Sequence, residues 1–329
     1  MRANKPKPGK RDEDHPNSRR GFLWQMGIGG LAAAGATCLS GTSPSDAPAA
    51  EPSPSEKASP LPTITIGGKT ITRLVTGSNP LTGASQATLN LSRLMNDYYT
   101  PERIADLLVR CDKVGINTFQ SSYADKIRDG LRMARERGAN LQWICLTTDG
   151  DGDREQVLAL KPIALVHHGG VTDRFFREGK SDQIHDFIKK AHDQGVLAGV
   201  SSHVPNNVRA VEEKDWGNDF FMTCFYNVVR TKEDLKRQLG DAPVDYMAYM
   251  SNDPIVMTDV IRKSRKPCLA YKILAAGRLC WTPQAVEEAF RFAFSNIKPT
   301  DGVIVGMFPR FADEPSENTA LTRKHGRNT

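Results

Sequence analysis

Two hydrophobic periods alternate along the chain from Thr63 to about Lys324, which predicts strands and helices that follow one another in turn. Residues 63–72 alternate apolar and polar positions on either side of Gly67-Gly68, so they predict a small hairpin with a two-residue turn. After the hairpin, short apolar runs predict buried strands. These strands cover residues 73–77, 116–120, 142–146, 163–166, 197–200, 219–226, 268–273 and 302–307.

The segments between these strands have the apolar spacing of amphipathic helices. The first, 101–114, follows Thr100 as a plausible N-cap and ends at Gly115. The others cover 125–137, 154–160, 182–193, 206–213, 231–239, 254–263, 283–295 and 315–324. Eight strands, each followed by helix, predict an α/β protein whose parallel sheet closes into a (β/α)8 TIM barrel.

The N-terminal segment predicts export. Residues 18–23 (SRRGFL) follow a basic stretch and precede a glycine-diluted apolar segment, 22–36, which is too short to be a comfortable membrane span. This pattern is typical of a twin-arginine signal over residues 1–40. It implies the twin-arginine export machinery as a partner, a periplasmic or otherwise exported location, and no stable membrane span. A signal anchor that stays attached is the alternative.

Composition changes twice along the chain. Residues 41–61 are rich in Pro, Ser and Ala and predict a disordered linker, so the folded domain is expected over 62–329. Half of the net charge of +6 lies in residues 1–50, and part of the rest lies in the C-terminal tail, so no nucleic-acid partner is expected. The six cysteines form no CxxC pair, which favours buried free thiols over a disulfide framework.

Candidate chemistry lies where the predicted strands end, because a TIM barrel carries its active site at the carboxyl ends of its strands. Imidazoles gather there, at His167, His168 and His203. The other candidates at these positions are Gln120 and Tyr123 after the second strand, Asp149 after the third, Ser202 after the fifth, Tyr226 and Asn227 at the sixth, and Tyr271 and Lys272 at the seventh.

Several of these segments together resemble the aldo/keto reductases, over nearly the whole folded part. The segments that carry the resemblance are the hairpin, 115–119 (GINTF), 165–167 (LVH), 199–202 (GVSS), 225–227 (FYN), and Glu317-Asn318 after Gly306. The resemblance implies an oxidoreductase that acts on a small carbonyl or sugar-type substrate with NADP or NAD.

The same resemblance assigns roles to residues of this chain. His167, or His168 in a shifted register, would orient the substrate oxygen, and Tyr123 or Tyr226 would donate the proton. Ser202 and Asn227 would hold the nicotinamide, and Tyr226 beside them would also contribute to the cofactor site. The phosphate end of the cofactor would meet Gly306, Arg310, Glu317 and Asn318.

The catalytic residues of that family are largely not retained. Gln120 stands where the family has an aspartate, and Tyr123 lies three residues beyond it rather than five. Thr147-Thr148 stands where the family has a lysine. A tyrosine without a nearby cation keeps a pKa of about 10, which makes it a poor proton donor for carbonyl reduction.

Two further hypotheses therefore stay open. One is a metal-assisted lyase, isomerase or hydrolase on the same barrel, in which His167 or His168, His203 and Asp149 would be ligands. The other is a barrel without catalysis that binds a ligand. Lys272 bears on both hypotheses, because a desolvated lysine can form a Schiff base, whereas a paired lysine is structural.

Overall fold

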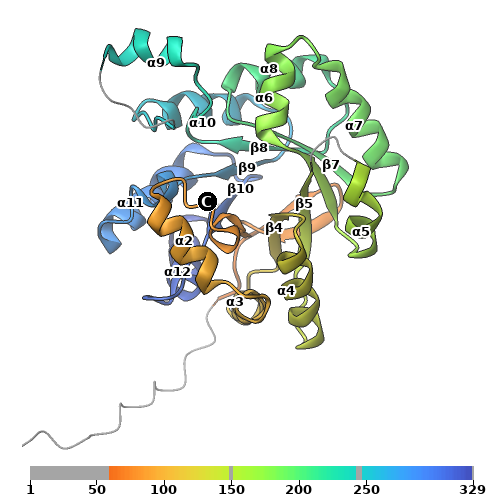
Figure 1. Cartoon of the computed structure of the whole chain (residues 1–329), viewed down its shortest axis with the longest axis vertical. Helices are drawn as coiled ribbons and strands as arrows, with labels where there is room; N and C mark the ends of the chain where they lie inside the picture. Colours follow the sequence, from red (N-terminus) through yellow and green to blue (C-terminus); the bar gives the residue numbers. More distant parts are fainter. Residues whose placement is uncertain (1–58, 148–150, 242–246, 328–329) are drawn as a thin grey trace, which may run out of the picture. The chain divides into compact units, whose positions relative to one another are not determined.

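The computed structural model describes residues 59–147, 151–241 and 247–327. The predicted signal, most of the linker, Thr148 and Asp149 lie outside these residues. Eight parallel strands close into a barrel in the order β10-β3-β4-β5-β6-β7-β8-β9, which confirms the predicted TIM barrel (Figure 1). The strands are β3 (Leu74–Gly77), β4 (Thr118–Ser122), β5 (Gln142–Thr147), β6 (Ala164–His167), β7 (Leu197–Ser202), β8 (Phe220–Cys224), β9 (Cys268–Tyr271) and β10 (Gly302–Gly306).

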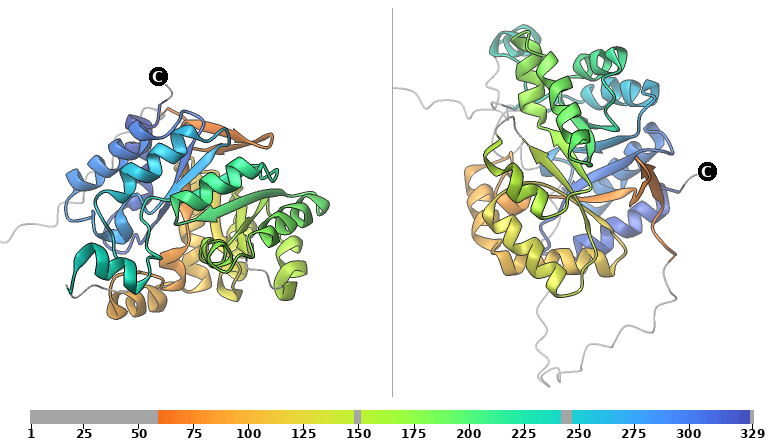
Figure 2. Two further views of the ribbon diagram at one scale, coloured as in Figure 1. Left: turned by 90° about the horizontal axis from the view of Figure 1, so that it is seen from above. Right: turned by 90° about the vertical axis from the view of Figure 1, so that its right-hand side faces the viewer.

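The predicted hairpin is present as β1 (Thr63–Ile66) and β2 (Lys69–Thr72), and it closes the amino-terminal end of the barrel. Its isoleucines belong to the apolar cluster inside the barrel, and Gln142 at the start of β5 donates to the Thr70 carbonyl. Figure 2 shows the hairpin at one end of the barrel, with α2 (Leu89–Tyr98) and α9 (Lys232–Leu239) at the other. The end opposite the hairpin is therefore the one left for a site.

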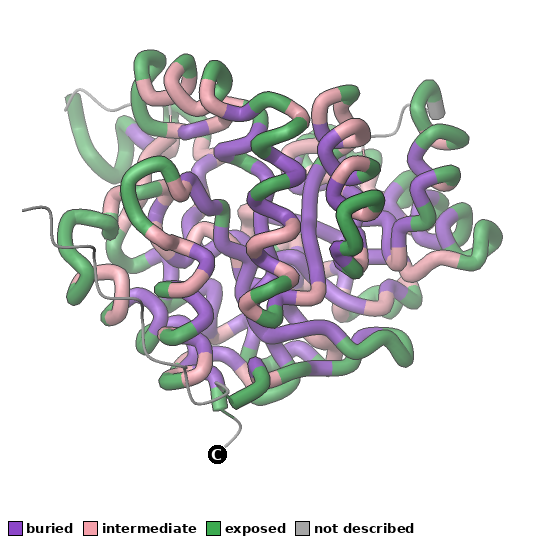
Figure 3. Tube along the Cα trace, turned by 90° about the horizontal axis from the view of Figure 1, so that it is seen from below, coloured by how far each residue is buried: buried purple, intermediate pink, exposed green. Residues whose placement is uncertain are grey.

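Side chains of each strand alternate between two apolar layers. Figure 3 shows the trace buried through the middle of the barrel and exposed mainly in the outer turns and loops. The inner layer fills the barrel and includes Ile144, Phe220 and Ile304. Phe220 needs the glycine beside it, since a Cβ on Gly199 would lie 2.6 Å from the phenyl ring. The outer layer, which includes Phe221, packs between the strands and the helices. This alternation decides which strand-end residues face the barrel mouth.

The helices follow the strands as expected, with two that the sequence analysis did not predict. These are α2 and α6 (Gly169–Arg177). The first residues of α6 are Gly169-Gly170, a pair that disfavours helix by propensity, and His168 caps the helix start by accepting from the Gly170 N–H. The remaining helices are α3 (Pro101–Lys113), α4 (Asp125–Glu136), α5 (Arg154–Ala159), α7 (Asp182–Asp193), α8 (Pro205–Lys214), α10 (Asp253–Lys263), α11 (Pro283–Asn296) and α12 (Glu314–His325).

The barrel closes where β10 pairs with β3, and Arg73 fixes this seam. The Arg73 guanidinium is buried and donates to three carbonyl oxygens, those of Asp301 at 2.8 Å, Gly326 at 2.7 Å and Lys298 at 3.0 Å. Asp301 in turn accepts from the Cys268 N–H at 2.8 Å and from the Lys298 ammonium at 2.9 Å. These contacts connect β9, β10 and the C-terminal end of α12 to the start of β3.

The expectation of free thiols is confirmed for the described cysteines. Cys111, Cys145, Cys224 and Cys268 are buried and unpaired, and Cys280 is exposed. In the described ranges, no helix is both long and apolar enough to cross a membrane.

We expect Arg73→Met to lower the free energy of unfolding by about 3 kcal/mol, because buried carbonyls lose charged donors that an apolar side chain does not replace. Urea unfolding followed by circular dichroism measures the change. The control is Arg237→Met, which removes only an exposed ion pair with Asp234 and should change stability by less than about 0.5 kcal/mol. Equal effects of both substitutions would contradict the role of Arg73 at the seam.

Candidate functional site

A buried carboxylate and an imidazole form the centre of the site at the carboxyl end of β7. Asp173 in α6 is fully buried and accepts from His203 Nδ1 at 2.8 Å and from the His203 backbone N–H at 3.2 Å. Its other oxygen accepts from Ser202 Oγ at 2.6 Å and from Asn207 Nδ2 at 2.9 Å. Asp173 therefore fixes the imidazole and leaves Nε2 as the ring nitrogen that can meet a ligand.

Electrostatics keep this pair in the form of a carboxylate and a neutral imidazole. Burial alone would raise the pKa of Asp173, but hydrogen bonds from His203 and Ser202 outweigh it and hold the pKa below its ordinary value. Burial lowers the pKa of His203, the charge of Lys272 lowers it further, and the hydrogen bond to Asp173 only partly opposes both. At neutral pH, His203 is therefore a base rather than a cation.

Hydroxyl groups from β7 and β9 lie beside His203. Tyr271 at the end of β9 packs edge-on against the His203 ring, with ring centroids 5.7 Å apart, and its hydroxyl lies 3.3 Å from Ser201 Oγ. A Cβ on Gly169 would lie within about 3.2 Å of Ser201 Oγ, His203 Cε1 and the Tyr271 hydroxyl, so these three groups converge on the start of α6. Burial raises the pKa of Tyr271 well above 10, so its hydroxyl stays protonated and can donate.

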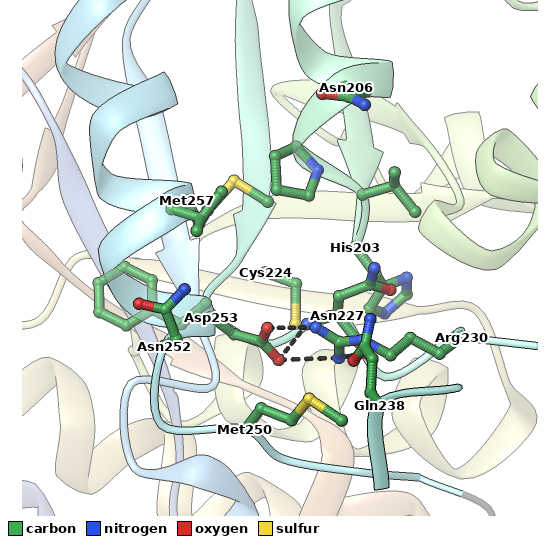
Figure 4. A pocket seen from close by; sticks show the side chains of 14 residues that line it. His203, Asn206, Cys224, Asn227, Arg230, Gln238, Met250, Asn252, Asp253 and Met257 are labelled. Atoms are coloured by element: carbon green, nitrogen blue, oxygen red, sulfur yellow. Dashed lines mark hydrogen bonds and ion pairs between the residues drawn. The ribbon is translucent and has the colours of Figure 1, made fainter. Parts of the chain in front are cut away.

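A cavity of about 410 Å³ opens beside His203, between the segments that follow β7 and β8 and the start of α10 (Figure 4). His203 and Cys224 belong to its wall. Four carboxamides line the rest together with apolar groups such as Met250 and Met257. These carboxamides are Asn206, Asn227, Gln238 and Asn252. Carboxamides donate and accept hydrogen bonds, so the cavity suits a small molecule with hydroxyl groups.

The only ion pair in the described lining of the cavity is Arg230 with Asp253. Two guanidinium nitrogens of Arg230 contact the two carboxylate oxygens, and Asp253 also accepts from the Asn227 N–H at 3.2 Å. Figure 4 shows this pair beside Met250. Because each charge neutralises the other, the pair holds the wall in place and leaves the cavity itself close to neutral.

The two neighbouring histidines of the sequence analysis lie on different faces of the barrel. His167 is fully buried in the outer layer, where Nδ1 lies 2.7 Å from Thr172 Oγ1 and the ring packs against Phe175 and Phe187. His168 caps α6 and lies near His203. Burial, followed by the charges of His203 and Lys272, lowers the pKa of His168. His168 therefore borders the site, whereas His167 packs under the helices.

Gln120 and Tyr123 lie on β4 and just after it, away from His203. Gln120 is buried and pairs in register with Ile144, so its side chain shares the inner face of the barrel. The Tyr123 hydroxyl donates to Gln156 of α5 at 2.8 Å, and Arg128 Nη1 lies 3.5 Å from it. The structure thus places Tyr123 between α4 and α5.

The residues expected at the nicotinamide have other contacts. Ser202 Oγ donates to Asp173 and accepts from the Val204 N–H at 3.0 Å. Tyr226 is buried, with its ring 5.1 Å from that of Tyr249. Asn227 lines the cavity. Of the three, Asn227 alone is placed to meet a ligand.

The residues expected at the cofactor phosphate meet acidic groups. α12 begins with Asp313 as its cap, which accepts from the Ser316 N–H at 3.2 Å and pairs with Arg110 at 2.6 Å. Glu314 accepts from the Phe308 N–H at 2.7 Å, and burial together with the charge of Glu317 raises its pKa. A phosphate would bind the free N–H groups at the start of α12, and the acidic residues Asp313, Glu314 and Glu317 already lie there.

The other residues of that group do not alter this picture. Arg310 is exposed, and its guanidinium lies over the rings of Tyr98 and Phe311. Asn318 is buried in α12. Gly306 packs closely against Pro80, since a Cβ on this glycine would lie 2.7 Å from the proline ring. Arg310 is the one cation of the group, and the contacts of its guanidinium are with the two aromatic rings. The residues present do not fit the phosphate end of a dinucleotide.

The metal hypothesis finds no ligand set in the part of the chain that the structure describes. No three His, Cys, Asp or Glu side chains there could hold an ion. Of the expected ligands, His167 faces the outer layer, His203 is bonded to Asp173, and Asp149 lies outside the described residues.

Sequence reasoning missed Asp173, on which the geometry of His203 depends. The segment that contains it, 169–177, begins with two glycines and was not predicted as helix. Its three donors, Ser202, His203 and Asn207, are separated from it by almost thirty residues or more. A single acidic residue among apolar neighbours only weakly indicates a buried, functional carboxylate. The contact between Asp173 and His203 is visible only in the folded structure.

No family model and no curated protein matches the chain. Among solved structures, a truncated 3-deoxy-D-arabino-heptulosonate 7-phosphate synthase from Thermotoga maritima is similar, at 13% identity and a TM-score of 0.47 over 82% of this chain and 92% of that one. A glycerol dehydrogenase from Gluconobacter oxydans is similar at 11% identity and a TM-score of 0.45, over 82% of this chain and 90% of that one. An aldo/keto reductase from Brucella melitensis is similar at 12% identity and a TM-score of 0.41, over 80% of this chain and 99% of that one. At these identities only the barrel is shared, and no activity follows from them.

We expect His203 to titrate below pH 6.5 in the folded protein, because burial and the Lys272 charge both disfavour the imidazolium. Lys272→Met should move the titration upward, toward 6.5, since it removes one of these two causes. NMR of histidine-labelled protein between pH 4 and 8 measures both values. The control, Lys189→Met on the exposed face of α7, should leave the His203 titration unchanged, and a shift of equal size there would contradict the assignment.

Proposed function

We propose that this protein is a TIM-barrel enzyme that moves a proton at a carbon next to the carbonyl group of a small hydroxylated substrate, with His203 as the general base and acid. The observation that carries the proposal is the pairing of His203 Nδ1 with buried Asp173 at the wall of the cavity. A neutral imidazole whose orientation is fixed can take a proton at Nε2 and return it.

The reaction can be written with the groups of this site. Nε2 of His203 accepts the proton from the C–H bond, the electron pair of that bond forms a C=C bond, and the carbonyl oxygen takes the negative charge. The hydroxyls of Tyr271 and Ser201 share one hydrogen bond and keep one O–H that can donate to this oxyanion. Return of the proton to the opposite face of the same carbon completes an epimerisation. Isomerisation requires that the hydroxyl proton on the deprotonated carbon first move to the former carbonyl oxygen, after which His203 returns its proton to the former carbonyl carbon.

His203→Gln should lower the rate of proton exchange by about 10²- to 10⁴-fold, the range typical of a positioned acid–base group. Exchange is measured by proton NMR in D2O as loss of the signal next to the carbonyl in D-glucose, D-fructose, dihydroxyacetone and D-glucuronate. The matched control is His185→Gln, since His185 lies in α7 outside the site, where its ring stacks on that of Trp216. An unchanged rate in His203→Gln, or no exchange with any of the four compounds, would contradict the proposal.

A nicotinamide-dependent reductase is the function that the resemblance implies, and the acidic start of α12 opposes it. A phosphate there would lie against Asp313, Glu314 and Glu317. We therefore expect NADPH and NADH to bind with a dissociation constant above about 1 mM, which is a binding free energy weaker than about 4 kcal/mol.

Fluorescence titration of both reduced cofactors against the purified protein measures this affinity. Micromolar binding that is lost in Asn227→Ala would favour the reductase instead, because Asn227 is the expected nicotinamide contact that lines the cavity.

A further inference from the structure

Lys272 places a positive charge at the barrel mouth for which the described residues supply no carboxylate. Its ammonium lies 4.9 Å from the centre of the Tyr271 ring, and no Asp or Glu oxygen of the described ranges lies within ion-pair distance of it. Its charge nevertheless reaches the site, since it lowers the pKa values of His168, His203 and Cys224, in each of which burial is the largest influence. Lys298, by contrast, pairs with Asp301 at 2.9 Å.

The backbone holds Lys272 in a conformation that lysine rarely adopts. Its φ is 61°, and Ala275 and Ala276 follow at 49° and 52°. Residues in this conformation are strained, and clusters of them are found at binding sites, where the surrounding structure holds a side chain in place. The Lys272 carbonyl accepts from the Ala275 N–H at 2.8 Å, which fixes this turn.

The carboxylates around the site cannot neutralise Lys272, because their hydrogen-bonding capacity is already used. Asp173 has four hydrogen bonds from His203, Ser202 and Asn207, and Asp253 is paired with Arg230. Lys272 thus remains a charged group at the mouth, beside the base His203, that no carboxylate of the described residues contacts. An anionic group of a ligand would supply the missing partner.

We propose that the substrate carries an anionic group, a carboxylate or a phosphate, that pairs with the Lys272 ammonium while its hydroxylated part lies against the carboxamides of the cavity. His203 and Cys224 connect the two regions, since both line the cavity and both lie within the reach of the Lys272 charge. This inference rests on the proposed function and names its substrate class, a sugar-like acid or sugar phosphate.

The test compares three probes that differ in one group: D-glucose, which is neutral, D-glucuronate, which carries a carboxylate, and D-glucose 6-phosphate. Isothermal titration calorimetry at low salt should show tighter binding of an anionic probe than of glucose by about 10-fold or more, as expected for a charge-assisted hydrogen bond. Whichever anion binds more tightly identifies the group. Equal affinities of all three probes, or no binding of any, would overturn the inference.

Variants separate Lys272 from a general effect of charge. Lys272→Met should remove the preference for the anion, Lys272→Arg should retain it, and Lys189→Met should leave it unchanged. The same thermal unfolding midpoint in all variants excludes misfolding. A Lys272-dependent preference in a protein that shows no proton exchange would refute the proposed function alone. A preference that survives Lys272→Met would refute the inference.

Discussion

Closure of the barrel between β10 and β3 is the constraint on which the rest of the structure depends. Arg73 fixes that seam by donating to carbonyls of two separate segments, the loop before β10 and the residue that follows α12. Once the seam is closed, the alternation along each strand decides which strand-end residues face the mouth and which face the helices. Ser201 and Tyr271 thereby meet inside the mouth. His167, which ends the neighbouring strand β6, faces the other way and packs against Phe175 of α6 and Phe187 of α7.

Asp173 has the same importance for the site that the seam has for the barrel. A buried carboxylate is costly unless it is fully hydrogen-bonded, and Asp173 meets this need with donors from β7, the segment after it, and α8. Its four hydrogen bonds fix the start of α6, orient His203 and keep the negative charge away from the cavity. Lys272 consequently lies at the mouth beside a neutral imidazole, and its ammonium is the group with which the anion of the proposed substrate would pair.

The barrel fold is common to many enzymes, whereas the polar residues at its mouth differ from those that the resemblance to aldo/keto reductases implies. The hairpin that closes the bottom was expected from the resemblance to aldo/keto reductases, and it is present. The helix start expected to hold a phosphate carries the acidic residues Asp313, Glu314 and Glu317 in its cap and first turn. Fold and reaction thus separate in this chain, because closing a barrel needs apolar strands, whereas catalysis needs a few polar groups in one place.

By itself, the sequence determined the order of strands and helices, the hairpin and the barrel, because apolar periodicity and turn residues act locally. It also located His203 and Lys272 at strand ends. It could not separate His167 from His168, since a shift of one residue reverses the face of a strand. Nor could it join Asp173 to His203, because their contact spans thirty residues. Only the closed tertiary structure, which fixes the register of every strand, decided which polar side chains share the mouth.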